Sequence, residues 1–235
     1  MAAQAEAAAI GGACPRRAQI RIDRRQSMDA KGPTWGRALG SALVDRESEF
    51  CLQTDAHMGF TPHWDSQMIQ MYADTRNEYA VLTTYVADKE TLGKNINGLW
   101  EVPHLCYTQW GEGGNVRNQQ AKAARNLARP KLSTLWAAGL AFSKCHAERR
   151  VPYDPFTPHV FDGEEFSRGA RLWTAGYDFY TPSRTVIAHD YKRSQRDAKH
   201  SAWDHGSGNE RTKSHARLAT LLEVGGVLKR SVLCK

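Results

Sequence analysis

Short strand-like runs alternate with helix-like stretches along most of this 235-residue chain. Residues 50–54, 79–86 and 133–143 are rich in apolar, β-branched or aromatic side chains, as buried strands are. Two shorter runs at 177–181 and 185–188 have the same character. Because helical patterns separate these runs, the sequence predicts an α/β fold with a mostly parallel central sheet flanked by helices.

The helices are predicted from apolar spacing and from the residues at their ends. Pro33 suits a first helical turn, and apolar residues follow it at helical spacing, so a helix is expected there. Further helices are expected over 63–72 and 212–223. Residues 18–22 resemble a short strand, and polar or glycine-containing loops are expected at 88–100, 111–115 and 200–208.

The stretch from residue 151 to residue 182 is aromatic and contains several prolines. Three prolines between 152 and 158 exclude helix there and predict an extended loop. Asp162 is expected to cap a helix, and Gly176 to end it in a left-handed conformation. The expected apolar stripe of this helix is Phe166, Ala170 and Trp173.

The cysteines show no motif for a metal ribbon or a dense disulfide framework. There are five of them, an odd number, and no two are separated by only two residues. They are Cys14, Cys51, Cys106, Cys145 and Cys234. This usage predicts reduced thiols, as in the cytoplasm, although it leaves a secretory compartment open.

The net charge of +7 suits several anionic partners, including nucleic acid, anionic membranes and phosphate-bearing small molecules. Nucleic-acid binding ranks low, because no DNA- or RNA-reading motif accompanies the basic residues. No run of about 18 apolar residues occurs, so no membrane span is expected in this chain. The first residues lack the basic start and leucine-rich middle of a secretory signal.

The most informative local motif is Asp55-Ala56-His57, directly after an apolar strand. Ligands of open α/β sheets bind beyond the carboxyl ends of the strands. Two residues that are two apart in extended backbone point to the same side, so this carboxylate and imidazole could bind one cation. Such ligands suit Mn²⁺, Zn²⁺ or Fe²⁺ better than Ca²⁺. His189, at the end of another apolar run, is the candidate third ligand, and the alternative is a capping Asp beside structural histidines.

Glu164 and Glu165 begin the helix of the aromatic segment. One glutamate is explained by the helix dipole. Two adjacent glutamates beside aromatic side chains indicate a polar substrate pocket.

Three segments together resemble the GlcNAc glycosyltransferases that modify hydroxyproline or threonine in polypeptides. The segments are DAHMGFTPHWD at 55–65, VPYDPFTPHVFDGEEFSRGARLWTAGYDFYTP at 151–182, and His189-Asp190-Tyr191. The resemblance extends from about Ile20 to Leu222. The chain is more distantly similar to the mucin-type polypeptide GalNAc transferases.

This resemblance implies a GT-A-like nucleotide-diphospho-sugar transferase fold and a retaining transfer from UDP-GlcNAc to a hydroxyl of a protein acceptor. It implies a divalent metal, Mn²⁺ first and Mg²⁺ as alternative, bound by Asp55, His57 and His189. It places Arg37, Asp55, Ala138 and Gly139 at the donor site, and Glu164 and Glu165 as catalytic residues against the donor sugar or the acceptor hydroxyl.

The uracil-binding strand and loop that begin this family's domain are not recognisable before Ile20. We therefore expect a flexible tail at 1–17, a partial GT-A-like domain at 18–224 that lacks its first βα unit, and a second tail at 225–235. The absent segment supports one alternative, a GT-A-like binding protein or truncated product without activity. The expected location is cytoplasmic, with association to the Golgi membrane as the alternative.

Overall fold

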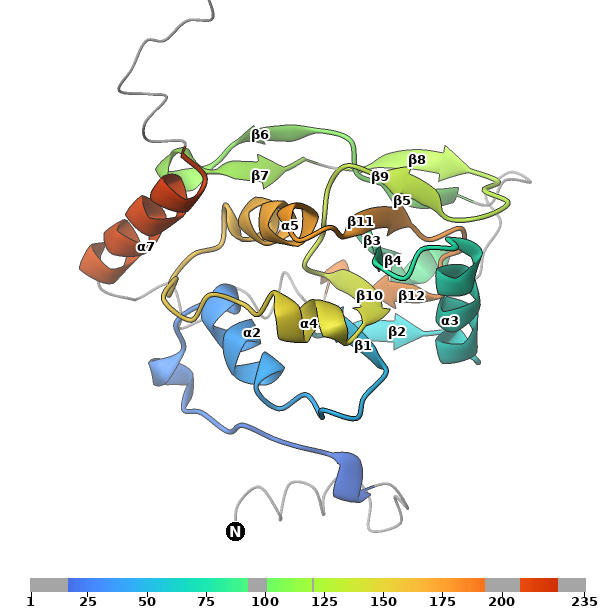
Figure 1. Ribbon diagram of the computed structural model, residues 1–235, viewed down its shortest axis with the longest axis horizontal. Helices are drawn as coiled ribbons and strands as arrows, with labels where there is room; N and C mark the ends of the chain where they lie inside the picture. Colours follow the sequence, from blue (N-terminus) through green and yellow to red (C-terminus); the bar gives the residue numbers. More distant parts are fainter. Residues whose placement is uncertain (1–16, 93–100, 120, 193–207, 224–235) are drawn as a thin grey trace, which may run out of the picture.

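The computed structural model describes residues 17–92, 101–119, 121–192 and 208–223 of the chain (Figure 1). The two predicted tails, apart from Arg17, lie outside these residues. So does nearly all of the loop predicted at 200–208.

Five strands form the central sheet, in the order β1-β10-β3-β11-β9. Their bounds are β1 Phe50–Thr54, β3 Ala80–Thr83, β9 Lys131–Ser133, β10 Leu140–Lys144 and β11 Asp178–Thr181. The predicted α/β class is confirmed, but the prediction of a mostly parallel sheet is wrong. Only β3 and β11 are parallel neighbours, and the other three pairs are antiparallel. Parallel neighbours need a crossover, usually a helix, whereas the chain between β3 and β10 forms short strands and hairpins and returns in the opposite direction.

Three smaller sheets complete the strand inventory of the described residues. In the first, β12 (Ile187–His189) pairs antiparallel with β2 (Met58–Phe60) and parallel with β4 (Ala87–Asp88). The other two are the pair β5 (Glu101–His104) with β8 (Lys122–Arg125) and the pair β6 (Thr108–Trp110) with β7 (Val116–Asn118). These two antiparallel pairs lie along one side of the molecule, at the top of Figure 1.

Most predicted helices are present with small shifts of their ends. They are α2 Pro33–Ser41, α3 Trp64–Asp74, α5 Glu164–Thr174 and α7 Gly208–Leu221. The short helix α4 His146–Arg150 is present in addition and was not predicted. Single 3₁₀ turns are η1 Arg17–Gln19, η2 Ser27–Asp29, η3 Lys89–Thr91 and η4 Glu112–Gly114. The strand expected at 18–22 is therefore absent. No helix among the described residues is both long and apolar enough to cross a membrane.

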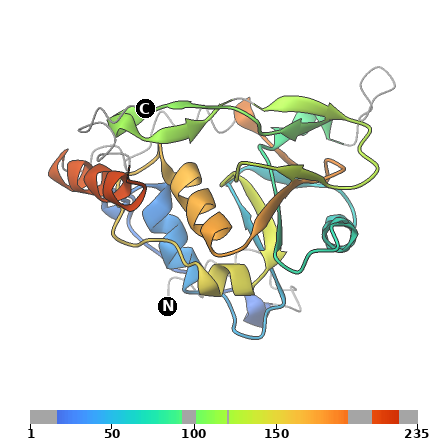
Figure 2. The same ribbon diagram turned by 45° about the horizontal axis from the view of Figure 1, so that its top comes forward.

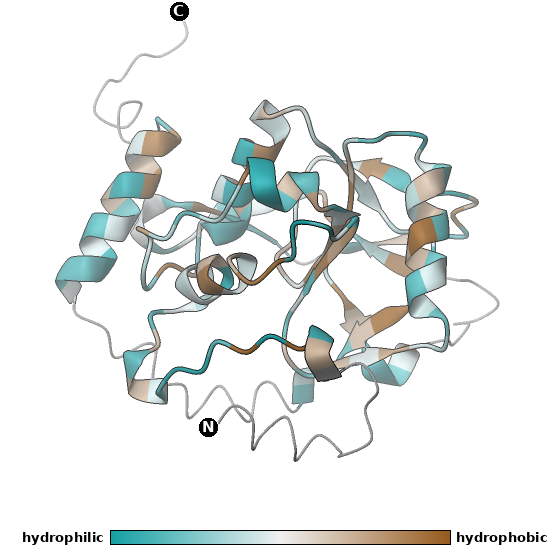
Figure 3. Ribbon diagram, turned by 60° about the horizontal axis from the view of Figure 1, so that its bottom comes forward, coloured by the Kyte–Doolittle hydropathy of each residue, from teal (hydrophilic) through white to brown (hydrophobic). Residues whose placement is uncertain are grey.

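Helices cover both faces of the central sheet, as Figures 1 and 2 show. On one face α3 packs Met68 and Met71 against Leu82 and Phe142. On the other face α4 and α5 pack against the neighbouring strand residues, among them Val81. Because side chains alternate along a strand, the odd and even positions of β3 supply the two cores. Figure 3 shows the apolar residues concentrated in the strands and on the helix faces toward them.

The predicted apolar stripe of α5 is wrong. Trp173 is 67% exposed, and Leu172 is buried instead. The buried face also includes Ser167 and Gly169. A Cβ on Gly169 would lie 3.2 Å from the Trp136 side chain, so the small residue lets this helix approach the residues before β10.

The ends of α5 agree only in part with expectation. Asp162 does not cap the helix, because its carboxylate accepts a hydrogen bond from the Glu112 backbone N–H. The residue at the N-cap position is Gly163. Gly176 has φ of 93°, which confirms the predicted left-handed residue after the helix.

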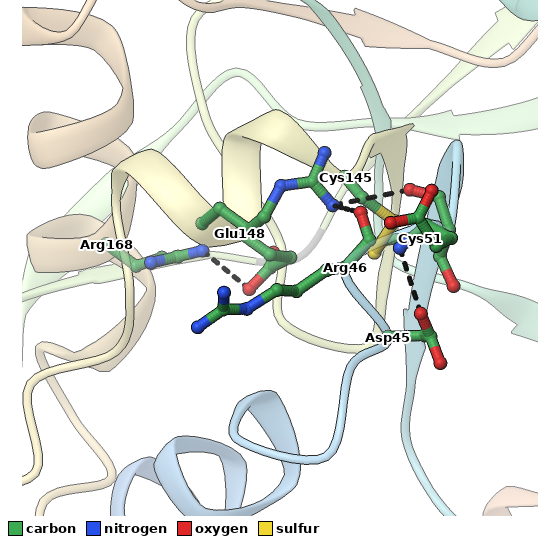
Figure 4. The surroundings of a disulfide bond; sticks show 9 residues. Asp45, Arg46, Cys51, Cys145, Glu148 and Arg168 are labelled. Carbon is green, nitrogen blue, oxygen red and sulfur yellow. Dashed lines mark hydrogen bonds and ion pairs between the residues drawn. A yellow bond between two sulfur atoms is a disulfide. The ribbon is translucent and has the colours of Figure 1, made fainter.

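A disulfide joins Cys51 in β1 to Cys145 at the start of α4 (Figure 4). The expectation of reduced thiols is therefore wrong for this pair. The two cysteines are 94 residues apart in sequence, and the antiparallel pairing of β1 with β10 brings their Cα atoms to 4.9 Å. Sequence spacing cannot show such a pairing, because it depends on the register of two strands. Beside it, Arg168 and Glu148 form an ion pair (Figure 4).

Candidate active site

The candidate site begins where β1 ends. Asp55 follows the last residue of β1, and the chain then bends at His57, which has φ of 63°, before β2 starts at Met58. The extended backbone assumed for Asp55-Ala56-His57 is therefore absent. The backbone N–H of Asp190 donates to the His57 carbonyl, which ties the bend to the end of β12.

Arg37 of α2 connects two of the predicted site residues. Its guanidinium forms ion pairs with Asp55 and with Glu164, the first residue of α5. The Glu164 side chain is only 3% exposed, whereas that of Asp55 is 43% exposed. Burial raises the pKa of Glu164, and the charge of Arg37 opposes this rise. Burial is the largest single influence on Arg37 and acts to lower its pKa. The interactions with Glu164, Tyr153 and Asp55 together outweigh it, so the pKa of Arg37 lies above its usual value.

Gly139 lies against the Asp55 carboxylate. A Cβ at this glycine would lie 3.0 Å from Asp55 Oδ2, so any larger residue would displace the carboxylate. The neighbouring Ala138 is buried, and its carbonyl accepts a hydrogen bond of 2.7 Å from Gln53 Nε2. The segment before β10 is thus fixed against the end of β1.

Glu165 is held at both carboxylate oxygens. Its Oε1 accepts a hydrogen bond of 3.0 Å from the Ala138 backbone N–H, and its Oε2 accepts one of 2.8 Å from the Tyr85 hydroxyl. Burial raises the pKa of Glu165 to about 7, although both hydrogen bonds act to lower it. Glu165 can therefore gain or lose a proton near neutral pH.

His57 and His189 lie side by side. The antiparallel pairing of β2 with β12 brings their ring centroids to 6.2 Å, with the ring planes at 86°. His189 is 5% exposed, and its Nδ1 is buried without a hydrogen-bond partner among the described residues. A buried nitrogen with no partner is costly unless it binds something, so this pair of rings suits a metal ion that takes imidazole ligands.

Asp55, the third predicted ligand, does not lie with the two histidines. Within the described part of the chain, no three His, Cys, Asp or Glu side chains converge closely enough to hold a metal ion. Asp55 is directed to Arg37 instead. The residues fit a metal site in which the two imidazoles are close together and the carboxylate has to exchange its partner.

A cavity of about 1130 Å³ lies beside β1, which is an edge strand of the described sheet. Its walls come from α2, from residues 43–48 and from β1, and they include Arg37 and Thr54. The cavity thus reaches the residue that precedes Asp55. Its volume is sufficient for a cofactor-sized ligand.

The structure brings the sequence-predicted residues together in two adjoining groups. The first group lies at the end of β1 and the second is the pair of histidines, His57 before β2 and His189 in β12. The first group consists of Arg37, Asp55, Ala138, Gly139, Glu164 and Glu165. Sequence reasoning missed Tyr85 and Gln53, which fix Glu165 and Ala138. Both belong to apolar strand-like runs. A side chain that can form hydrogen bonds within such a run is the one feature of the sequence that could have singled them out.

Comparison with known proteins gives a family and a fold. The family model described as Glycosyltransferase (GlcNAc) matches residues 3–234. Among solved structures, the chain is similar to the crystal structure of GalNAc-T7 with UDP, GalNAc and Mn²⁺, with a TM-score of 0.53 and 15% identity. That match covers 86% of this chain and 36% of the other, so the chain spans about a third of that protein's length. It supports the predicted GT-A-type fold. A search of curated proteins finds no match.

Proposed function

Because the chain belongs to the Glycosyltransferase (GlcNAc) family, we propose that it transfers N-acetylglucosamine from UDP-GlcNAc to a hydroxyl of a protein acceptor. The acceptor residue would be hydroxyproline, threonine or serine, and the reaction would retain the anomeric configuration. One observation carries the proposal. Arg37, Asp55, Gly139 and the two glutamates of α5 meet at one point in the fold, although they lie far apart in the sequence.

The cavity beside β1 is the proposed place for the nucleotide part of the donor. Arg37 lies in its wall and also contacts Asp55, so a diphosphate bound there would be near a fixed cation. Charge on the leaving diphosphate is the main electrostatic demand of sugar transfer from a nucleotide donor. Gly139 leaves space for a sugar against the backbone beside Asp55.

Asp55, His57 and His189 are the proposed ligands of a divalent metal, Mn²⁺ or alternatively Mg²⁺. The bound metal would supply a positive charge that stabilises the leaving diphosphate. Two observations support this assignment: His57 is close to His189, and the buried Nδ1 of His189 has no hydrogen-bond partner in the part of the chain that the structure describes. Arg37 keeps the Asp55 carboxylate oriented at the end of β1 until the carboxylate changes partner.

The two glutamates have different proposed roles because their environments differ. Glu164 is paired with Arg37 and almost fully buried, so it stays in place and holds Arg37 toward the donor site. Glu165 is only partly buried and has a pKa near neutral, so it is the better candidate to contact a reacting hydroxyl.

A donor-turnover assay tests the proposed reaction. The purified chain would be supplied with UDP-GlcNAc, Mn²⁺ and peptides that carry hydroxyproline or threonine, and released UDP and glycosylated peptide would be measured. We expect Asp55→Asn to lower turnover at least about 100-fold. The matched control is Asp65→Asn, an exposed aspartate of the same motif, which should retain wild-type turnover.

Two outcomes would contradict the proposal. Turnover that is equal in Asp55→Asn and wild type would exclude the metal and donor roles of this carboxylate. Tight, metal-dependent UDP binding without turnover of any UDP-sugar would favour a binding protein that has kept the fold.

The location of the protein is a separate proposal. The Cys51–Cys145 disulfide favours an oxidising compartment, such as the lumen of the secretory pathway, over the cytoplasm. Thiol trapping before cell lysis would test this. A pair of free thiols in the trapped protein would instead favour the cytoplasm.

A further inference from the structure

Tyr85 lies between β3 and β4, and its hydroxyl lies between two acceptors. It donates to Glu165 Oε2 at 2.8 Å, and the Asn118 carbonyl oxygen is 3.5 Å away on β7. A phenol has one proton, so it can donate fully to only one of these oxygens at a time. Its oxygen can also accept a hydrogen bond.

These two acceptors allow Tyr85 to satisfy Glu165 in either protonation state. When Glu165 is a carboxylate, Tyr85 donates to it. When Glu165 is protonated, Glu165 donates to the Tyr85 oxygen, and the Tyr85 proton turns toward the Asn118 carbonyl. The exchange keeps the number of hydrogen bonds when the phenol oxygen moves about 0.5 Å toward the Asn118 oxygen, because 3.5 Å is longer than an ordinary O–H···O bond.

The second oxygen of Glu165 does not change its partner. The Ala138 N–H donates to Oε1, so the carboxyl group stays in one orientation while Tyr85 reverses its role. The charged and titratable groups that act on Glu165 are Glu164 and Arg37, which raise and lower its pKa respectively. Arg117 and Tyr191 act in opposite directions on the pKa of Tyr85, which burial and Glu165 raise.

We propose that Tyr85 is a positioning residue that holds the Glu165 carboxyl in one place in both protonation states, so that Glu165 can take a proton from a substrate hydroxyl. The inference rests on the proposed function. In the step, the proton passes from the hydroxyl to the Glu165 carboxylate. The electron pair left on that oxygen forms the bond to the sugar carbon on the face from which the diphosphate departs, so the anomeric configuration is retained. The bond from this carbon to the diphosphate breaks with its electron pair on the diphosphate.

The test is an infrared titration of the Glu165 carboxyl group in the full chain. Subtracting the spectra of Glu165→Gln from those of the wild type isolates the band of this carboxyl. In wild type the band should titrate near neutral pH, and in Tyr85→Phe the midpoint should rise by about one pH unit. The variant loses the Tyr85 hydrogen bond in both protonation states, but the bond to the ionised carboxylate is charge-assisted and stronger than the bond to the neutral acid, so the ionised form is destabilised more. Tyr79→Phe is the matched control, since Tyr79 is 44% exposed and its ring packs against His146 and Tyr177; it should leave the midpoint unchanged.

A second signal comes from the unaltered tyrosine. The Tyr85 C–O band should shift at the same midpoint as the Glu165 band in wild type, because the phenol changes from donor to acceptor toward Glu165. This shift should be absent in Glu165→Gln. The readout remains informative even where Tyr85→Phe does not fold.

The kinetic readout is the pH profile of turnover. In Tyr85→Phe the profile should move with the infrared midpoint, while the KM for UDP-GlcNAc stays within about twofold of wild type. An unchanged infrared midpoint in Tyr85→Phe, or no coupled tyrosine band, would overturn the proposal. A shifted midpoint in a protein that turns over no UDP-sugar would contradict the proposed function and leave the contact between Tyr85 and Glu165 established.

Discussion

At the scale of single residues, the ion pair with Arg37 offsets the free-energy cost of burying the Glu164 carboxylate. Glu164 is 4% exposed, and the described residue that offsets its charge most directly is Arg37. We expect Arg37→Gln to lower the free energy of unfolding by about 3 kcal/mol at pH 7, because it leaves a buried carboxylate unpaired. Urea unfolding would measure this loss.

A surface ion pair provides the control. Arg125→Gln removes a pair with Glu101 in which the arginine is 63% exposed, and should cost less than about 1 kcal/mol. The loss in Arg37→Gln should also shrink at lower pH, where Glu164 can become neutral. An equal loss in both variants would show that burial of Glu164 does not depend on Arg37.

Glu165 should make the stability of the protein fall as the pH rises. Its pKa in the folded chain is about 7, above the usual value of 4.5 for a glutamate, so the folded state binds more protons than the unfolded state between these values. The contribution is fully present below about pH 4.5 and lost as the pH passes 7. Urea unfolding at several pH values should show that Glu165→Gln removes this slope. Glu47→Gln, at an exposed position, should keep it.

The sequence predicts which residues lie together at the candidate site better than it predicts their hydrogen bonds. Asp55, Glu164 and Glu165 lie in segments that resemble a known family, and the structure brings them to the same place. The pairing of Asp55 with Arg37 was not predictable, because it depends on the position of α2 beside the end of β1. Tyr85 looked like one more aromatic residue of a strand, and only the packing of α5 shows that its hydroxyl is used.

At the scale of elements, local pattern was sufficient for most helices and insufficient for strand direction. Pro33 predicts the start of α2 and Gly176 predicts the end of α5, and the structure has both helix ends at these positions. The sequence predicts a central strand over 133–143 with a tight turn at Gly139. The structure has the turn at 138–139, but the run contains the end of β9, a loop and most of β10. Apolar composition alone does not show where such a run turns, and the direction of each strand follows from the turns.

The disulfide links β1 to the start of α4 and should contribute several kcal/mol to the free energy of unfolding. Cys51 and Cys145 close a loop of 94 residues, so the bond restricts the unfolded chain strongly. We expect the double variant Cys51→Ala, Cys145→Ala to lose about 3–4 kcal/mol in the free energy of unfolding. The exposed free Cys106 provides the control, and Cys106→Ser should change stability by less than about 0.5 kcal/mol.

Reductant should reproduce this effect in the wild type. Urea unfolding of the wild type in dithiothreitol should approach that of the double variant, and dithiothreitol should not change the double variant further. Wild type that is equally stable with and without reductant would mean that the two thiols are not paired in the isolated protein.

At the scale of the whole molecule, the candidate site connects parts of the fold that otherwise touch different cores. Arg37 comes from α2 on one face of the sheet. His189 comes from β12 and His57 from the bend before β2, and Ile187 of β12 packs in the core on the α3 face. A ligand that contacts both groups would stabilise the assembled fold and not the separate elements. Binding to the folded state alone stabilises by about 2.7 kcal/mol at a ligand concentration 100 times the Kd.

We therefore expect UDP and Mn²⁺ together to raise the melting temperature by about 5–10 °C, measured by calorimetry at saturating ligand. The gain should disappear when EDTA removes the metal, because UDP alone would lack the cation between its diphosphate and Asp55. His189→Ala should lose the gain, since it removes the buried imidazole proposed as a metal ligand. His63→Ala, at the exposed histidine before α3, should keep it. A gain that persists in EDTA would show that the nucleotide binds through Arg37 and the cavity beside β1 without a metal.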